Sequence, residues 1–133
     1  MKSIKISIPS LIENITIIES FIDNAREKFK INDDIYGNIM ISVTECVSNA
    51  IIHGNKQNKK KTVNIELRFL DDQLRFIIKD EGEGFDFQSL KDPTAPEHLQ
   101  VPGGRGVFIM KHLSDEVQFM DSGRTTILTF YMN

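Results

Sequence analysis

Cysteine is almost absent from this chain. Cys46 is the only one, so no disulfide can form within the chain. This fits a reducing compartment, and we expect a cytoplasmic protein. The three histidines are scattered, which excludes the usual zinc sites. No uninterrupted apolar run approaches the length of a membrane span, and the alternating N-terminus does not read as a signal peptide, so we expect no membrane partner.

An excess of positive charge is lacking as well. The formal net charge is −3, which argues against nucleic acid as a partner. The 133 residues predict one domain over residues 1–133. A chain of this size buries roughly 65–70% of its unfolded surface, enough for a core without disulfides or metals.

Hydrophobic periodicity predicts an α+β fold. Alternating and helical patterns follow one another as a strand at 3–8, helices at 10–29 and 33–54, strands at 63–69 and 74–79, an irregular stretch at 81–103, a helix at 104–113, and strands near 116–121 and 125–132. The strand faces alternate cleanly, so the helices should cover one face only. We predict a two-layer sandwich with a mixed, mostly antiparallel sheet.

The second predicted helix carries a polar stripe. Glu45, Asn49 and His53 are four residues apart and therefore share one side of the helix. A carboxylate one turn from a carboxamide suits holding a metal ion and steering a nucleophile. The simpler alternative is a solvated helix face, with His53 as an ordinary helix-end histidine.

A second motif, Asp80-Glu81-Gly82-Glu83-Gly84, ends the strand at 74–79. Asp80 is in step with the apolar positions of that strand, so its carboxylate should point inward, which is costly unless a donor meets it. A purine amino group is one such donor, although a solvated turn would have the same composition. Thr126 should also face inward on the last strand, either near Asp80 or as a core threonine bonded to backbone.

A third motif, Gly103-Gly104-Arg105-Gly106-Val107, opens the helix at 104–113. Free N–H groups at a helix start favour phosphate oxygens, and Arg105 could add a charged contact. A plain loop before a helix would also use glycine, and the Walker A pattern is not matched. The lysine-rich segment 56–61 is read as a solvated connection, with contact to acidic groups as the alternative.

In this order the three motifs resemble those of the GHKL superfamily, the Bergerat-fold ATP-binding domains of gyrase, certain chaperones, histidine kinases and mismatch-repair proteins. Glu45 and Asn49 match its N box. The first glycine box is matched by Asp80, Gly82 and Gly84, and the second by Gly104 and Gly106. Within the superfamily, the runs at 45–54 and 103–112 are most similar to bacterial anti-sigma factor serine/threonine kinases. One departure is visible, because Arg124 interrupts the usual Gly-Thr-Thr motif.

The resemblance implies a histidine kinase-like ATPase domain with ATP and Mg²⁺ as cofactors. It implies that Asp80 binds the adenine amino group with Thr126 nearby, that Asn49 holds Mg²⁺, and that Glu45 is the general base. Carried over by position, Gly104, Arg105 and Gly106 cradle the phosphates, Gly82, Gly84 and Val107 also bind the cofactor, and residues of about 87–103 form a lid.

The resemblance also implies partners. They are a STAS-type anti-sigma factor antagonist, which is phosphorylated, a sigma factor, and a second copy of the chain that meets residues 3–8 and the first helix. A nucleotide-dependent binding module without phosphotransfer is the main alternative. A histidine-kinase catalytic domain is a third reading, and it would need a phosphoacceptor helix before residue 10.

Overall fold

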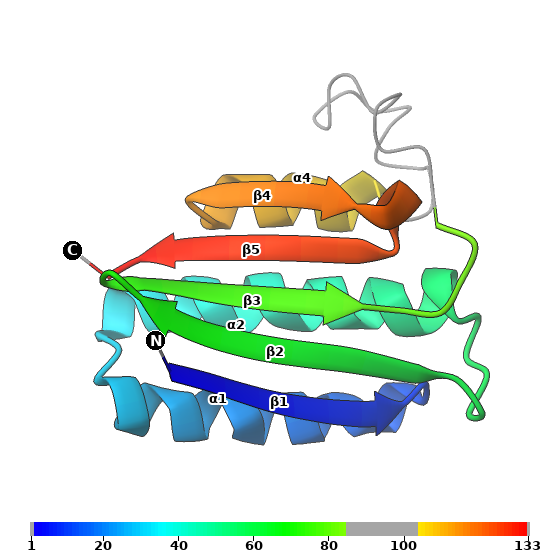
Figure 1. Cartoon of the computed structure of the whole chain (residues 1–133), viewed down its shortest axis with the longest axis horizontal. Helices are drawn as coiled ribbons and strands as arrows, with labels where there is room; N and C mark the ends of the chain where they lie inside the picture. The colour runs from blue at the N-terminus through cyan, green and yellow to red at the C-terminus, as the bar shows by residue number, and fades with distance from the viewer. Residues whose placement is uncertain (1, 85–103, 133) are drawn as a thin grey trace.

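Five strands form one sheet, and the helices of the described residues lie together on one of its faces (Figure 1). The computed structural model describes residues 2–84 and 104–132. The strands are β1 (Lys2–Pro9), β2 (Thr62–Leu70), β3 (Gln73–Lys79), β4 (Glu116–Met120) and β5 (Thr125–Tyr131). The helices are α1 (Ile15–Phe29), α2 (Asp33–Asn49) and α4 (Gly104–Leu113), and short turns lie at η1 (Ile12–Asn14), η2 (Ala50–Gly54) and η4 (Asp121–Gly123). The predicted α+β sandwich is therefore confirmed.

The sheet has the order β1-β2-β3-β5-β4, and each of these four pairings is antiparallel. The order makes β3 and β5 neighbours, although a long segment separates them in sequence. Ile78 of β3 lies opposite Thr126 of β5. The ends of β3 and α2 and the start of β5 therefore meet at one end of the molecule (Figure 1).

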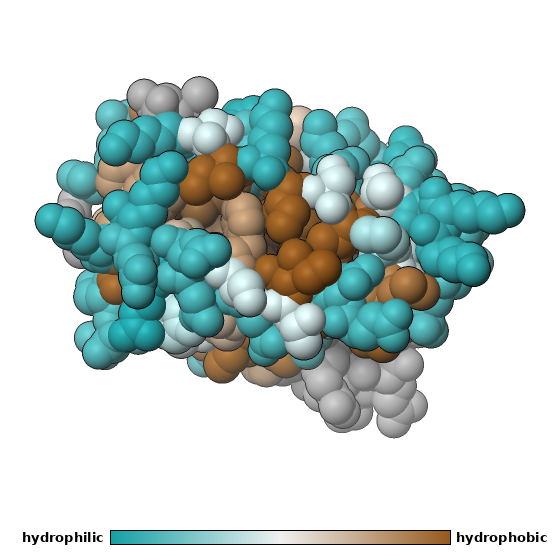
Figure 2. Space-filling view, turned by 90° about the horizontal axis from the view of Figure 1, so that it is seen from below, coloured by the Kyte–Doolittle hydropathy of each residue, from teal (hydrophilic) through white to brown (hydrophobic). Residues whose placement is uncertain are grey.

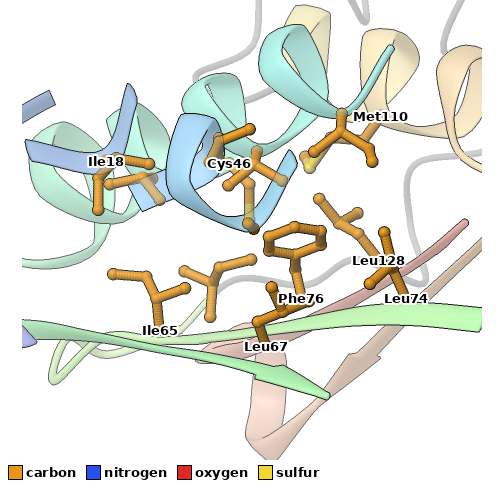
Figure 3. Close-up of a cluster of buried hydrophobic side chains, with 14 of the residues drawn as sticks. Ile18, Cys46, Ile65, Leu67, Leu74, Phe76, Met110 and Leu128 are labelled. Atoms are coloured by element: carbon orange, nitrogen blue, oxygen red, sulfur yellow. The ribbon is translucent and has the colours of Figure 1, made fainter. Parts of the chain in front are cut away.

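The core lies between the sheet and α2, which packs against α1, α4, β3 and β5. Alternate residues of β2, β3 and β5 point into it, and Figure 3 shows Leu67, Phe76 and Leu128 facing Cys46 and Met110 of the helices. The rings of Phe76 and Phe130 meet edge to face with centroids 6.0 Å apart. The alternation predicted from sequence thus corresponds to real burial on one sheet face.

The start of α2 is capped as its sequence suggests, because the Asn32 side chain accepts a hydrogen bond from the Ile35 N–H (3.0 Å). The first helix, however, begins at Ile15 and not at residue 10. Ser10 is held to the Lys61 carbonyl through both its N–H (3.1 Å) and its hydroxyl (2.7 Å), which keeps that part of the chain extended.

The predicted helix at 33–54 also changes form at its end. Residues Ala50–Gly54 make a π-helical turn, in which the Asn55 N–H donates to the Ala50 carbonyl (2.8 Å). Single π turns inside longer helices are frequent at functional sites. The wider turn alters the direction in which the residues after Asn49 point.

Among the described residues, one helical segment, Asp33–Gly54, is long and apolar enough by length and composition to cross a membrane. This differs from the expectation drawn from uninterrupted apolar runs. Its apolar stripe of Ile39, Val43, Val47 and Ile51 is fully buried inside the fold. A core helix passes the same test of length and composition, and this burial accounts for the apolar character of the segment.

Candidate functional site

A pocket opens where α2 ends, between η2, the ends of β3 and β5, and α4. It encloses about 580 Å³ of empty space, part of it open to solvent. Its lining residues come from each of the three sequence motifs and from the last strand: Cys46, Asn49, Ala50, His53, Gly54, Ile78, Asp80, Gly84, Val107, Gly123 and Thr126.

Asp80 supplies the half-buried carboxylate of this pocket. It follows β3 directly, and its N–H donates to the Arg124 carbonyl (3.0 Å), so the β3–β5 pairing continues one step beyond the strand. The predicted inward direction of the side chain is confirmed. Burial raises the pKa of Asp80 above its ordinary value, while the Gly82 N–H (2.8 Å from Oδ1) and the charges of Arg124 and Lys61 oppose that rise.

Glycines let three backbone segments meet at this carboxylate. A Cβ on Gly54 would lie 2.6 Å from both Cγ and Oδ2 of Asp80. A Cβ on Gly82 would overlap the Gly54 carbonyl, and one on Gly84, whose φ is +82°, would overlap the Ser122 carbonyl. The loop after β3 is therefore packed tightly between η2 and the β4–β5 turn.

Gly54 has a different role from the one expected of a helix-ending glycine. Such a glycine usually adopts a left-handed conformation. Here the left-handed residues are Lys56 (φ 54°) and Gln57 (φ 57°), and Gly54 is not among the positive-φ positions. Glycine is needed at position 54 because of the space that the Asp80 carboxylate takes.

Cys46 and Thr126 form part of the buried wall beside Asp80. Cys46 is 4% exposed and Thr126 is 7% exposed. Burial raises the pKa of the Cys46 thiol to about 12, a hydrogen bond with Thr126 lowers it, and the charges of Asp80 and Glu45 raise it. The thiol therefore stays protonated at neutral pH and behaves as a small apolar group.

Glu45 and Asn49 lie at the α4 side of the pocket, although Glu45 is not itself a lining residue. A Cβ on Gly106 would lie 3.2 Å from Glu45 Oε2 and would overlap the Asn49 amide nitrogen. The first turn of α4 thus presses its backbone against both polar side chains of α2. A helix start carries free N–H groups and a partial positive charge, so this corner suits an anion.

Several predicted site residues lie at or beyond the limits of the described part. Gly104 and Arg105 begin α4, but the surroundings of their side chains are outside the described residues, as are Gly103 and the predicted lid at 87–103. Gly82 packs on Gly54 without lining the pocket, whereas Val107 does line it and is 2% exposed.

Sequence reasoning missed Gly54, Cys46 and Gly123 as pocket residues. Gly54 and Cys46 stand within the run at 45–54 whose similarity to the kinases was noted above, so that run gave a signal for both positions. Gly123 begins the interrupted Gly-Thr-Thr motif, which gave a signal, but its place in the pocket depends on the pairing of β5 with β3.

The fold and the pocket together define an α+β sandwich domain with a half-buried carboxylate in a pocket between the sheet and its helices, and with a helix start at one side. The chain belongs to the histidine kinase-like ATPase domain family, whose model matches residues 8–132.

Curated relatives are similar along almost the whole chain. The serine-protein kinase RsbW of Bacillus subtilis (strain 168) is 32% identical, covering 98% of this chain and 86% of that protein. The serine-protein kinase RsbW of Bacillus licheniformis is 30% identical with the same coverage.

A solved structure shares the fold. The RsbU and RsbW domains of Rv1364c from Mycobacterium tuberculosis match with a TM-score of 0.73 at 16% identity. The match covers 99% of this chain, which spans 33% of that one.

The close approach of Gly54 to Asp80 leads to a first prediction. Gly54→Ala should lower the affinity for adenine nucleotides at least about tenfold. The added methyl group displaces the Asp80 carboxylate, which the resemblance assigns to the adenine amino group, and a hydrogen bond to a charged group is worth about 1.5–3 kcal/mol. Isothermal titration calorimetry with ADP measures the effect. Gly37→Ala is the matched control, since it lies on the same helix with nothing within 4 Å of its Cβ position. Equal affinity of the Gly54 variant and the parent would show that the contact is unimportant.

The raised pKa of Asp80 leads to a second prediction. A carboxyl whose pKa is raised by folding stabilises the fold below its ordinary pKa of 3.8, and this stability is lost as the pH rises through the raised value. Asp80→Asn should therefore increase the free energy of unfolding at pH 7.5, and the increase should shrink toward pH 4. Urea denaturation at both pH values measures it, with the exposed Asp72→Asn as control. A variant less stable than the parent at pH 7.5 would contradict the prediction.

Proposed function

We propose that this protein is an ATP-dependent serine/threonine protein kinase that acts as an anti-sigma factor and phosphorylates a STAS-type anti-sigma factor antagonist. The observation that carries the proposal is the single pocket in which Asn49, Asp80 and Val107 meet beside Glu45. The similarity to serine-protein kinases over 98% of the chain supports the same activity.

The adenine would enter the apolar part of the pocket. The Asp80 carboxylate is the acceptor for its amino group, and the Thr126 hydroxyl lies on the neighbouring strand in the same wall. Cys46, Ile78 and Val107 offer apolar contact to the ring, since each is less than 5% exposed and lines the pocket. This combination distinguishes a purine that donates through its amino group from one that cannot.

The phosphates would lie toward the start of α4. Gly104, Arg105 and Gly106 open this helix, and Gly84 of the loop after β3 also lines the pocket. Asn49 has a carboxamide oxygen of the kind that Mg²⁺ accepts. Among the described residues there is no cluster of three His, Cys, Asp or Glu, so phosphate oxygens and water would complete the shell. When bound there, Mg²⁺ would supply positive charge that neutralises the charge developing on the phosphates during transfer.

Glu45 is the proposed general base. It stands one helical turn before Asn49, so its carboxylate is beside the proposed phosphate site and outside the base pocket. There it can accept the proton of an incoming serine or threonine hydroxyl, which then attacks the terminal phosphate. Such a base contributes roughly 10²–10⁴-fold in rate.

A binding module that holds a partner without transferring phosphate is the second candidate. It would need the base pocket and the phosphate contacts but no base at position 45. The carboxylate next to Asn49 therefore favours the kinase. Mixing the protein with labelled ATP and candidate antagonist domains separates the two, because only a kinase transfers label.

We further propose a cytoplasmic homodimer that also binds a sigma factor. The edge of β1 supports the dimer, because among the described strands β1 pairs with β2 alone, which leaves the other edge of β1 open to a further strand. Asp23 and Arg26 of α1 contact Tyr36 of α2, so the opposite flank of α1 faces this edge. That flank carries Ile17, which is 41% exposed, and the partly buried Phe21.

Figure 2 views the molecule from this edge and shows hydrophobic residues gathered near its centre, with hydrophilic residues around them. The partly buried Ile4 and Ile6 of β1 belong to the same edge. An exposed apolar patch with a polar rim is a common mark of a protein interface.

The base assignment leads to a third prediction. Glu45→Gln should bind ATP like the parent but transfer phosphate to the antagonist at least about 10²-fold more slowly, because the proton acceptor is lost. Single-turnover labelling and calorimetry measure the two quantities. Glu19→Gln on the exposed side of α1 is the control. Labelling by the Glu45 variant at the parent rate would remove Glu45 from the role of base.

The edge patch leads to a fourth prediction. Ile17→Lys should shift the protein from dimer to monomer in analytical ultracentrifugation, because a charge would be buried in the interface. Met120→Lys is the matched control, since Met120 is 50% exposed on β4 at the opposite edge of the sheet. A dimer that persists in the Ile17 variant at low micromolar concentration would place the interface elsewhere.

A further inference from the structure

Asn55 is a buried polar residue beside the pocket whose side chain makes hydrogen bonds to three separate segments. It is 1% exposed. Its Nδ2 donates to Ser10 Oγ (2.7 Å) and to the Thr62 carbonyl (3.0 Å), and its Oδ1 accepts from the Glu81 N–H (2.7 Å). The residue thus joins the link after β1, the start of β2 and the loop after β3.

The partners of Asn55 are bonded to one another as well. The Glu81 carboxylate accepts from the Thr62 N–H (2.5 Å), and the Ser10 hydroxyl donates to the Lys61 carbonyl (2.7 Å). Because Ser10 uses its proton there, its oxygen is left to accept from Asn55. The directions of these hydrogen bonds are therefore fixed, and a carboxamide is the group that satisfies them, with a donor toward Ser10 and Thr62 and an acceptor toward Glu81.

This network acts on the pocket through sequence neighbours. Gly54, directly before Asn55, is the residue whose Cβ position meets the Asp80 carboxylate, and its carbonyl packs against Gly82. Glu81, whose N–H is held by Asn55, directly follows Asp80. Asn55 therefore fixes both sides of that contact, the η2 turn and the loop that carries Asp80.

We propose that Asn55 is a positioning residue of the base pocket, which sets the place of Asp80 without touching the nucleotide. This rests on the proposed function, in which Asp80 accepts from the adenine. In the part of the chain that the structure describes, the Asn55 side chain bonds to Ser10, Thr62 and Glu81. It makes no hydrogen bond to Glu45 or Gly106, which meet each other on the proposed phosphate side. Loss of Asn55 should consequently affect nucleotide binding and leave the transfer step itself unchanged.

The test compares Asn55→Ala with Asn58→Ala in phosphotransfer kinetics and ADP calorimetry. Asn58 is an exposed asparagine of the same connection, so it controls for the loss of an amide there. In Asn55→Ala the KM for ATP and the Kd for ADP should rise about tenfold, while kcat at saturating ATP stays within about twofold of the parent. A purely structural role would instead lower the folded, active fraction and leave KM unchanged.

Two further variants serve if Asn55→Ala does not fold. Asn55→Asp keeps the acceptor for the Glu81 N–H and loses the donors, and Ser10→Ala removes one partner alone. A raised KM in the folded variants supports the proposal, and a parent-like KM in them overturns it. A parent protein that binds no adenine nucleotide would refute the proposed function itself, which is a separate outcome.

Discussion

The Asp80 carboxylate lies at the end of a core-facing strand, in a pocket whose burial raises its pKa. Keeping a charge there requires support from every side. The Gly82 N–H donates to it, Arg124 and Lys61 favour its ionised form, and Gly54 leaves it room. The π turn, the glycines and the β3–β5 pairing are arranged around this one group.

In the proposed function, the same arrangement places recognition of the base and chemistry at the phosphates in two different parts of the site. The proposed base pocket is formed by the end of β3 and the start of β5 with Cys46 and Thr126. Glu45 and Asn49 of α2 instead lie against the first turn of α4. α2 connects the two parts, because Cys46 directly follows Glu45 and lies three residues before Asn49. In the proposed function, a single helix thus fixes the distance between the residues that would recognise the base and those that would act at the phosphates. Its buried stripe holds the helix against the sheet.

Patterns within one segment were enough to predict much of this architecture. Strand parity gave the inward direction of Asp80 and Thr126, and helical spacing placed Glu45 beside Asn49. What could not be predicted depends on contacts between distant segments. The π turn, the true reason for Gly54 and the three partners of Asn55 follow from how η2 meets the loop after β3. The late start of α1 has the same origin, since Lys61 holds Ser10.

The tight packing of Gly54 against Gly82, and of Gly84 against Ser122, has a consequence for how this protein can evolve. The rim at these glycines consists of main chain. A side chain introduced at Gly82 or Gly84 would force two segments apart. Adaptation toward another ligand must therefore act on the positions that present side chains to the pocket: Cys46, Asn49, Ala50, His53, Ile78, Asp80, Val107 and Thr126. The main-chain contacts at the rim must stay as they are, so ligand preference can change only through the side chains that line the pocket.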